Sequence, residues 1–132
     1  MNERKKERKK EKTSNHFCRV FRDDEEFAHW MLPRKGVVNS FVAETNGVIT
    51  DMISFYFLNS SVIKNPKHST LFAVYSFYNV AQTVSLTELM RDALILAKNN
   101  GADVFNCLDL MDNGQIFSEL KFGIGDGNLQ YY

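Results

Sequence analysis

The alternation of apolar and polar residues predicts a β-hairpin early in the chain. Residues 38–45 and 48–58 are rich in β-branched and aromatic side chains, which favour strands. Asn46 and Gly47 stand between them, and this pair readily adopts the two positive φ angles of a tight turn. The two segments are therefore expected to pair as antiparallel strands.

A third strand is expected after a polar connection. Residues 59–70 contain Pro66 and many small polar side chains, a composition typical of a loop. Residues 71–80 return to the strand-forming pattern. Together with the hairpin, they predict a meander of three antiparallel strands.

Two stretches have the periodicity of amphipathic helices. Residues 23–32 begin with two aspartates and are followed by Pro33, which ends a helix. Ser85 and Glu88 form a Ser-x-x-Glu capping pattern, after which apolar residues recur at helical spacing up to Ala97. One short and one longer helix are predicted.

The rest of the chain completes a mixed fold. Residues 103–108 predict a short buried strand, residues 115–120 a brief helix and residues 128–132 a final strand. This order of elements is typical of an α+β domain in which helices pack on a mainly antiparallel mixed sheet. The final strand stops on two tyrosines that need a packing partner, so we expect the chain to be truncated there.

Charge is distributed unevenly along the chain. The net charge of zero hides seven lysines or arginines against three glutamates in residues 1–12, while the remainder has nine basic and thirteen acidic residues. Residues 1–15 lack apolar side chains after Met1, so we predict a disordered basic tail followed by a domain over residues 16–132. The tail is a candidate for sequence-independent contacts with RNA, the ribosome or an acidic membrane, and a merely solvated charge run is the alternative.

Cysteine content and hydropathy indicate the compartment. Cys18 and Cys107 have no paired spacing, so a disulfide framework is not expected. No apolar run reaches the roughly 18 residues that cross a bilayer, and the charged start is unlike a secretory signal. A cytoplasmic protein without a transmembrane segment is therefore expected.

The most distinctive local pattern is Gly-Ile-Gly-Asp-Gly at residues 123–127. Glycines let a backbone approach a ligand closely, and Asp126 offers acceptors for an amine, although a plain turn explains the same run. The run lacks the Lys-Ser/Thr ending of a phosphate-binding loop. The three histidines are far apart and have no cysteine at a ligand spacing, so no metal site is expected. Cys107 lies in an apolar segment and is interpreted as a small core residue.

Longer segments resemble one enzyme family. The last twelve residues, KFGIGDGNLQYY, resemble the C-terminal signature of eukaryotic protein N-myristoyltransferases, also called glycylpeptide N-tetradecanoyltransferases. The similarity extends back to about residue 24 and includes EEFAHWMLP (25–33), DMISFY (51–56), YSFYNV (75–80), DALILA (92–97) and DVFNCLDLM (103–111).

The resemblance implies a fold, an activity and a set of site residues. Members of this family transfer a myristoyl group from myristoyl-coenzyme A to the N-terminal glycine of a protein, and their fold is a pair of acetyltransferase-like halves. This chain resembles the second half, which mainly supplies the peptide groove. Transferred by motif, the groove positions are Ser60, Tyr75, Asn106, Asp126 and Gly127. Ser60, Tyr75 and Asn106 would hold the peptide by hydrogen bonds, and Asp126 would attract a basic residue downstream of the substrate glycine.

The resemblance implies no catalytic residue in this chain. In the family, the acyl-coenzyme A site and the oxyanion hole lie in the first half, and the base is the terminal carboxylate of a longer chain. We therefore expect a chain truncated at both ends that binds no cofactor, presents part of a groove to a peptide with an N-terminal glycine, and is inactive alone. The alternatives are a non-catalytic peptide- or RNA-binding module and a non-functional fragment.

Overall fold

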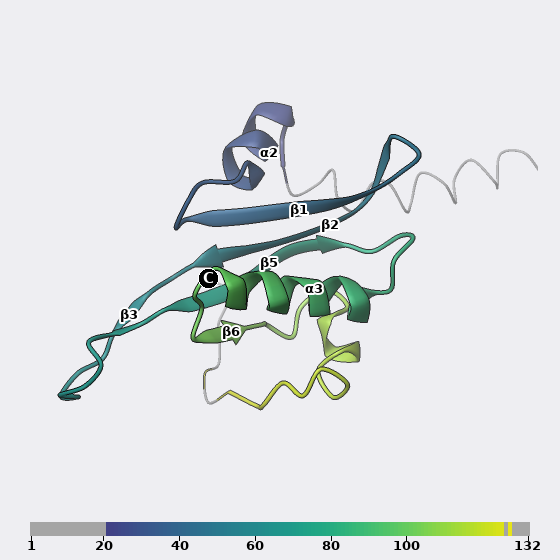
Figure 1. The fold of residues 1–132 in the computed structure, drawn as a ribbon. Coiled ribbons are helices and arrows are strands. Elements are labelled where there is room, and N and C mark those ends of the chain that lie inside the picture. Colours follow the sequence, from purple (N-terminus) through teal and green to yellow (C-terminus); the bar gives the residue numbers. More distant parts are fainter. Residues whose placement is uncertain (1–20, 126, 128–132) are drawn as a thin grey trace, which may run out of the picture.

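A four-stranded mixed sheet organises the part of the chain that the structure, a computed structural model, describes: residues 21–125 and residue 127. The strand order is β1 (Val38–Thr45), β2 (Val48–Phe57), β5 (Ala73–Val80) and β6 (Val104–Asn106) (Figure 1). The first three strands are antiparallel, and β6 joins β5 in parallel. The predicted α+β class is confirmed.

The hairpin between β1 and β2 forms at the predicted turn. Asn46 and Gly47 have φ angles of 52° and 78°, the left-handed conformation that this pair tolerates well. The pairing runs from Val38 opposite Tyr56 to Thr45 opposite Val48. Local sequence therefore determines both the turn and the register of this hairpin.

Two helices lie on opposite faces of the sheet. Helix α3 (Leu86–Asn99) packs on the face that carries Ile53 and Phe55. Helix α2 (Asp24–Met31) places Met31 against Ser54, with 3.8 Å between its Sδ atom and the hydroxyl. Because successive strand residues face opposite sides, Ser54 belongs to the other face.

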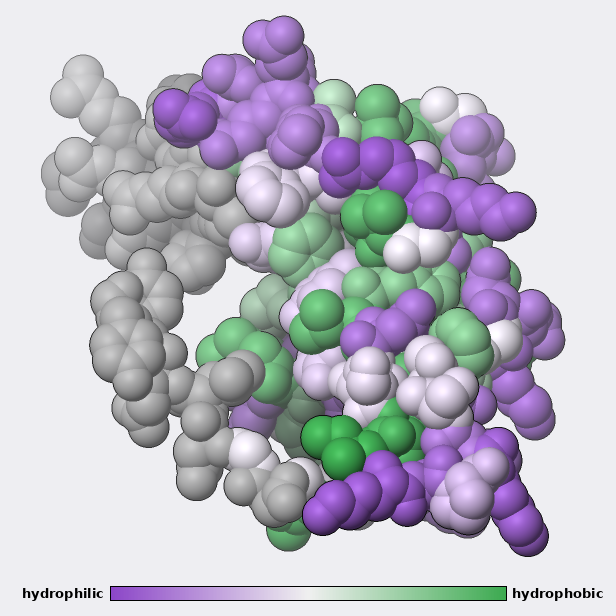
Figure 2. Space-filling model, turned by 90° about the vertical axis from the view of Figure 1, so that its left-hand side faces the viewer, coloured by the Kyte–Doolittle hydropathy of each residue, from purple (hydrophilic) through white to green (hydrophobic). Residues whose placement is uncertain are grey.

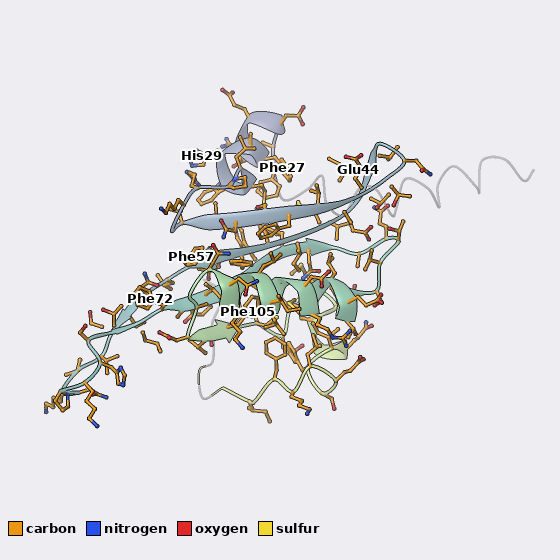
Figure 3. All side chains as sticks on the ribbon, in the orientation of Figure 1. Phe27, His29, Glu44, Phe57, Phe72 and Phe105 are labelled. Carbon is orange, nitrogen blue, oxygen red and sulfur yellow. The ribbon has the colours of Figure 1, made fainter. Side chains whose placement is uncertain are left out.

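The core lies between the sheet and α3. Phe55 has no exposed surface, and the rings of Phe41, Phe57 and Phe105 lie 5.8 to 6.0 Å from it between centroids. Figure 3 labels Phe57 on β2 and Phe105 on β6. The other buried members of the core are Ile53, Val74, Leu89, Met90, Ala93, Ala97 and Ile116.

Two predicted segments differ from the structure. A ladder of two short strands, β3 (Ser60–Ser61) and β4 (Thr70–Leu71), joins the two ends of the predicted loop at residues 59–70, takes in the first residue of the strand predicted at 71–80, and extends beyond the main sheet (Figure 1). The helix predicted at residues 115–120 is wrong. A 3-10 helix, η1 (Asn113–Gln115), occurs earlier, and hydrogen-bonded turns follow it.

The cause of the second difference is a long-range contact. The Asn113 side chain is buried, accepts a hydrogen bond from the amide of Asn79 at 3.0 Å, and donates one to the carbonyl of Leu108 at 3.0 Å. The bond with Asn79 anchors the start of the segment to the end of β5. The predicted tail at residues 1–15 and the predicted strand at residues 128–132 lie outside the described residues.

Candidate functional site

A row of four side chains crosses the sheet on the face away from α3. Val38 pairs with Tyr56, Tyr56 with Tyr75, and Tyr75 with Asn106. Directly paired residues of neighbouring strands project from the same face, so these side chains stand side by side. The row brings two predicted site residues, Tyr75 and Asn106, next to each other.

Tyr75 and Asn106 line a cavity of about 560 Å³ beside β6, which we call the β6 cavity. Phe105, Cys107 and Phe122 contribute apolar surface to it, and residues 123–125 with Gly127 form part of its wall. The cavity therefore combines a polar amide and a phenol with mainly apolar walls, as ligand-binding sites commonly do.

The glycines of this wall are not required by the chain's own conformation. None of Gly123, Gly125 and Gly127 has a φ in the left-handed region, and a β-carbon built on any of them would meet no other described atom within 4 Å. No other described residue occupies the space beside them. An extended ligand can therefore approach this backbone closely.

The five predicted site residues do not all lie in the same place. Tyr75, Asn106 and Gly127 line the β6 cavity. Ser60 is exposed on β3, pairs with Leu71 of β4, and is not among the described residues that line the cavity. Asp126 lies outside the described residues.

Asp109 was not selected from the sequence. It is the one charged residue among the described residues that line the β6 cavity. Its position in the segment DVFNCLDLM, three residues after Asn106, was the available signal. Its negative charge lies beside this cavity and would attract an amine or a basic side chain, while its Oδ1 atom lies against Gly114.

Cys107 has the environment of a packing residue. It packs against the hydrophobic core, and burial raises the pKa of its thiol above the ordinary value. A thiol with a raised pKa is a poor nucleophile near neutral pH. Within the described residues, no three His, Cys, Asp or Glu side chains form a group that could hold a metal ion.

A second cavity, of about 530 Å³, adjoins the first, and we call it the α2 cavity. Trp30 of α2, Arg34, Leu110 and Met111 are among the residues that line it. Leu108 lines both cavities. On the side of the molecule shown in Figure 2, hydrophobic residues collect in the middle, between hydrophilic residues above and below.

The part of the chain that the structure describes has no helix with the length and apolar character needed to span a membrane.

Comparisons with known proteins agree on one family. The family model "Myristoyl-CoA:protein N-myristoyltransferase, C-terminal domain" matches residues 8–132. "Glycylpeptide N-tetradecanoyltransferase 2" of Danio rerio is 57% identical over 110 residues, which are 83% of this chain and 22% of that protein. The chain thus spans about a fifth of that relative's length.

Solved structures give the same result for the fold. The crystal structure of Saccharomyces cerevisiae N-myristoyltransferase with bound myristoyl-CoA has a TM-score of 0.73 and 36% identity, over 80% of this chain and 31% of that chain. A ribosomal-protein-alanine N-acetyltransferase from Brucella melitensis has a TM-score of 0.56 at 17% identity, over 86% of this chain and 80% of that chain. At this identity only the fold is shared, and the predicted acetyltransferase-like architecture is confirmed.

Proposed function

This chain belongs to the myristoyl-CoA:protein N-myristoyltransferase family, as a match to its C-terminal domain, and we propose that it forms part of the groove that binds the substrate peptide. The observation that supports this proposal is the pairing of Tyr75 with Asn106 in the β6 cavity, beside an open wall of glycines. The ligand would be a peptide with an N-terminal glycine.

The chemistry of the cavity suits an extended peptide. The Asn106 amide can donate to a peptide carbonyl and accept from a peptide N–H, which are the two groups that an extended backbone presents. The Tyr75 ring supplies an apolar surface and its hydroxyl a further hydrogen bond. Asp109, and by the family resemblance Asp126, would favour a basic residue in the peptide.

The proposed role is binding rather than chemistry. Transfer of an acyl group to an amine requires a bound thioester, donors directed at the developing oxyanion, and a base. The resemblance assigns these to parts of the family enzyme that the match to this chain does not cover. We therefore propose that the 132-residue chain binds the peptide without transferring myristate to it.

Direct binding tests the proposal. A labelled peptide with an N-terminal glycine and a lysine a few positions downstream is titrated with the 132-residue protein, and fluorescence anisotropy is measured. We predict that Asn106→Ala and Tyr75→Ala each weaken binding by about fivefold or more, since truncating a central contact commonly costs over about 1 kcal/mol. Replacing the peptide's lysine with glutamate should also weaken binding.

The matched control is Asn99→Ala, which removes the same amide from the exposed end of α3. It should leave the affinity unchanged. Equal affinity of wild type and Asn106→Ala, with both proteins folded by circular dichroism, would contradict the proposed site. Myristoylation of the peptide by the 132-residue protein alone, given myristoyl-CoA, would contradict the purely binding role.

A further inference from the structure

The ring of Tyr56 contacts two rings of the neighbouring strand. It stacks on Tyr75, with 5.4 Å between the ring centroids and 16° between the planes. It also meets the edge of Phe77, at 5.5 Å and 77°. Burial raises the pKa of the Tyr56 hydroxyl, and the neighbouring Tyr75 raises it further. Tyr56 is therefore held by packing on more than one side.

The backbone under this pair is held in register by Ser54. Two residues of β5, Phe77 and Tyr78, face the single residue Ser54 of β2, which makes a β-bulge. The Ser54 hydroxyl donates to the carbonyl of Tyr78 at 2.9 Å and accepts from its N–H at 3.0 Å. A slip of one residue between β2 and β5 would move Tyr75 to the α3 face, so the bulge, held by the Ser54 hydrogen bonds, keeps Tyr75 on the same face as Tyr56.

The two tyrosines belong to different cavities. Tyr75 lines the β6 cavity, whereas Tyr56 lines the α2 cavity. The stacked pair thus stands where the two cavities adjoin. A peptide in the β6 cavity would contact Tyr75 directly, and Tyr56 would affect its binding only through the ring of Tyr75.

A strand residue such as Tyr75 has more than one common side-chain rotamer. The parallel stack restricts this choice, because only one orientation of Tyr75 lies flat on Tyr56. A ring that is already oriented loses less conformational entropy when a peptide packs on it. The stack therefore prepares Tyr75 for binding.

We propose that Tyr56 is a positioning residue of the peptide groove, which acts by holding the ring of Tyr75 in the orientation that a bound peptide meets. This inference rests on the proposed function of the β6 cavity. It goes beyond that function by assigning a role to a residue that does not line the cavity.

The test compares Tyr56→Phe with Tyr56→Val in the peptide titration. Phenylalanine retains the stack, whereas valine suits a strand but removes the ring. We predict near wild-type affinity for Tyr56→Phe and a loss of about two- to tenfold for Tyr56→Val, the size expected for an aromatic pair. Equal affinity of the two variants would overturn the proposal.

A destabilised control separates positioning from general loss of structure. Met52 lies on the same strand, is 9% exposed, and pairs with Val80 rather than with Tyr75. Met52→Ala should lower the melting temperature and leave peptide affinity unchanged. If Met52→Ala weakens binding as much as Tyr56→Val, the effect is one of stability and the proposal fails.

A second measurement needs no peptide. In proteins labelled at tyrosine, NMR should show contacts between the rings of Tyr56 and Tyr75 and a defined set of Tyr75 ring signals. These signals should remain in Tyr56→Phe and become averaged in Tyr56→Val. Unchanged Tyr75 signals in Tyr56→Val would overturn the inference, whereas failure of the wild type to bind peptide would count against the proposed function alone.

Discussion

The carboxylate of Asp51 accepts hydrogen bonds from the loop that follows β5 and from its own neighbour on β2. Its Oδ1 atom accepts from the N–H groups of Gln82, Thr83 and Val84 at 2.6, 2.8 and 3.1 Å. Its Oδ2 atom accepts from the hydroxyls of Thr50, at 2.6 Å, and Thr83. Asp51 is only 1% exposed. These bonds fasten the turn that leads from β5 into α3.

These hydrogen bonds determine the charge state of Asp51. Burial by itself raises the pKa of the carboxyl group, but the hydrogen bonds from Thr50, Thr83 and Val84 outweigh burial, and the pKa lies well below its ordinary value of 3.8. A depressed pKa in the folded state stabilises the fold above the ordinary pKa. That contribution is lost as the pH falls through the folded pKa.

We therefore predict that Asp51→Asn lowers the melting temperature at pH 7 by on the order of 10 °C, because the amide cannot accept all these bonds. As the pH falls from about 4 to 2, the melting temperature of the variant should also decrease less steeply than that of wild type. Thermal melts across this pH range measure both effects. Asp92→Asn, an exposed change on α3, should behave like wild type; a pH profile of Asp51→Asn parallel to wild type would contradict the assignment.

The sequence could not reveal these residue contacts. Asp51 stands out there only as the first letter of DMISFY, and its partner Gln82 is 31 residues away. The same limit applies to the site. The motifs selected Tyr75 and Asn106, but their pairing depends on the parallel register of β5 and β6, and Asp109 joins them only in the folded chain.

At the scale of elements, local patterns were reliable. The helix predicted after Ser85 has the full capping box. The N–H of Glu88 donates to the Ser85 hydroxyl at 3.2 Å, and the N–H of Ser85 donates to the Glu88 carboxylate at 3.4 Å. The Asn46-Gly47 turn is equally local. Elements that depend on distant partners, such as η1 with its Asn113–Asn79 bond, were missed or misplaced.

We predict that Ser85→Ala destabilises the protein by about 1 kcal/mol, because it leaves the first turn of α3 without its side-chain acceptor. Urea denaturation followed by circular dichroism measures this change. Ser118→Ala, an exposed serine in the turns after η1, is the matched control and should change stability much less. Similar losses of stability in both variants would indicate that the capping box makes no specific contribution to stability.

At the scale of the whole molecule, the two faces of the sheet differ. The face under α3 is packed, whereas the other face carries the row from Val38 to Asn106 and the two cavities. The site therefore lies at the less protected side of the fold. In addition, β6 has three residues and, within the described residues, pairs only with β5.

This asymmetry predicts a pattern of hydrogen exchange. Amides of β2, which pairs on both sides, should exchange most slowly, and those of β6 considerably faster. Addition of the glycine peptide should slow exchange in β6 and in residues 122–125, measured by mass spectrometry. The β1–β2 turn serves as the internal reference, and protection confined to that turn would argue against the β6 cavity as the peptide site.

Trp30 gives this molecule an intrinsic optical probe. It is the single tryptophan of the sequence, it is 47% exposed, and it lies at the α2 cavity. Indole emission shifts to shorter wavelength when water is excluded from the ring. Excitation of tryptophan alone therefore reports, without any label, whether another polypeptide or a ligand covers this face of the domain.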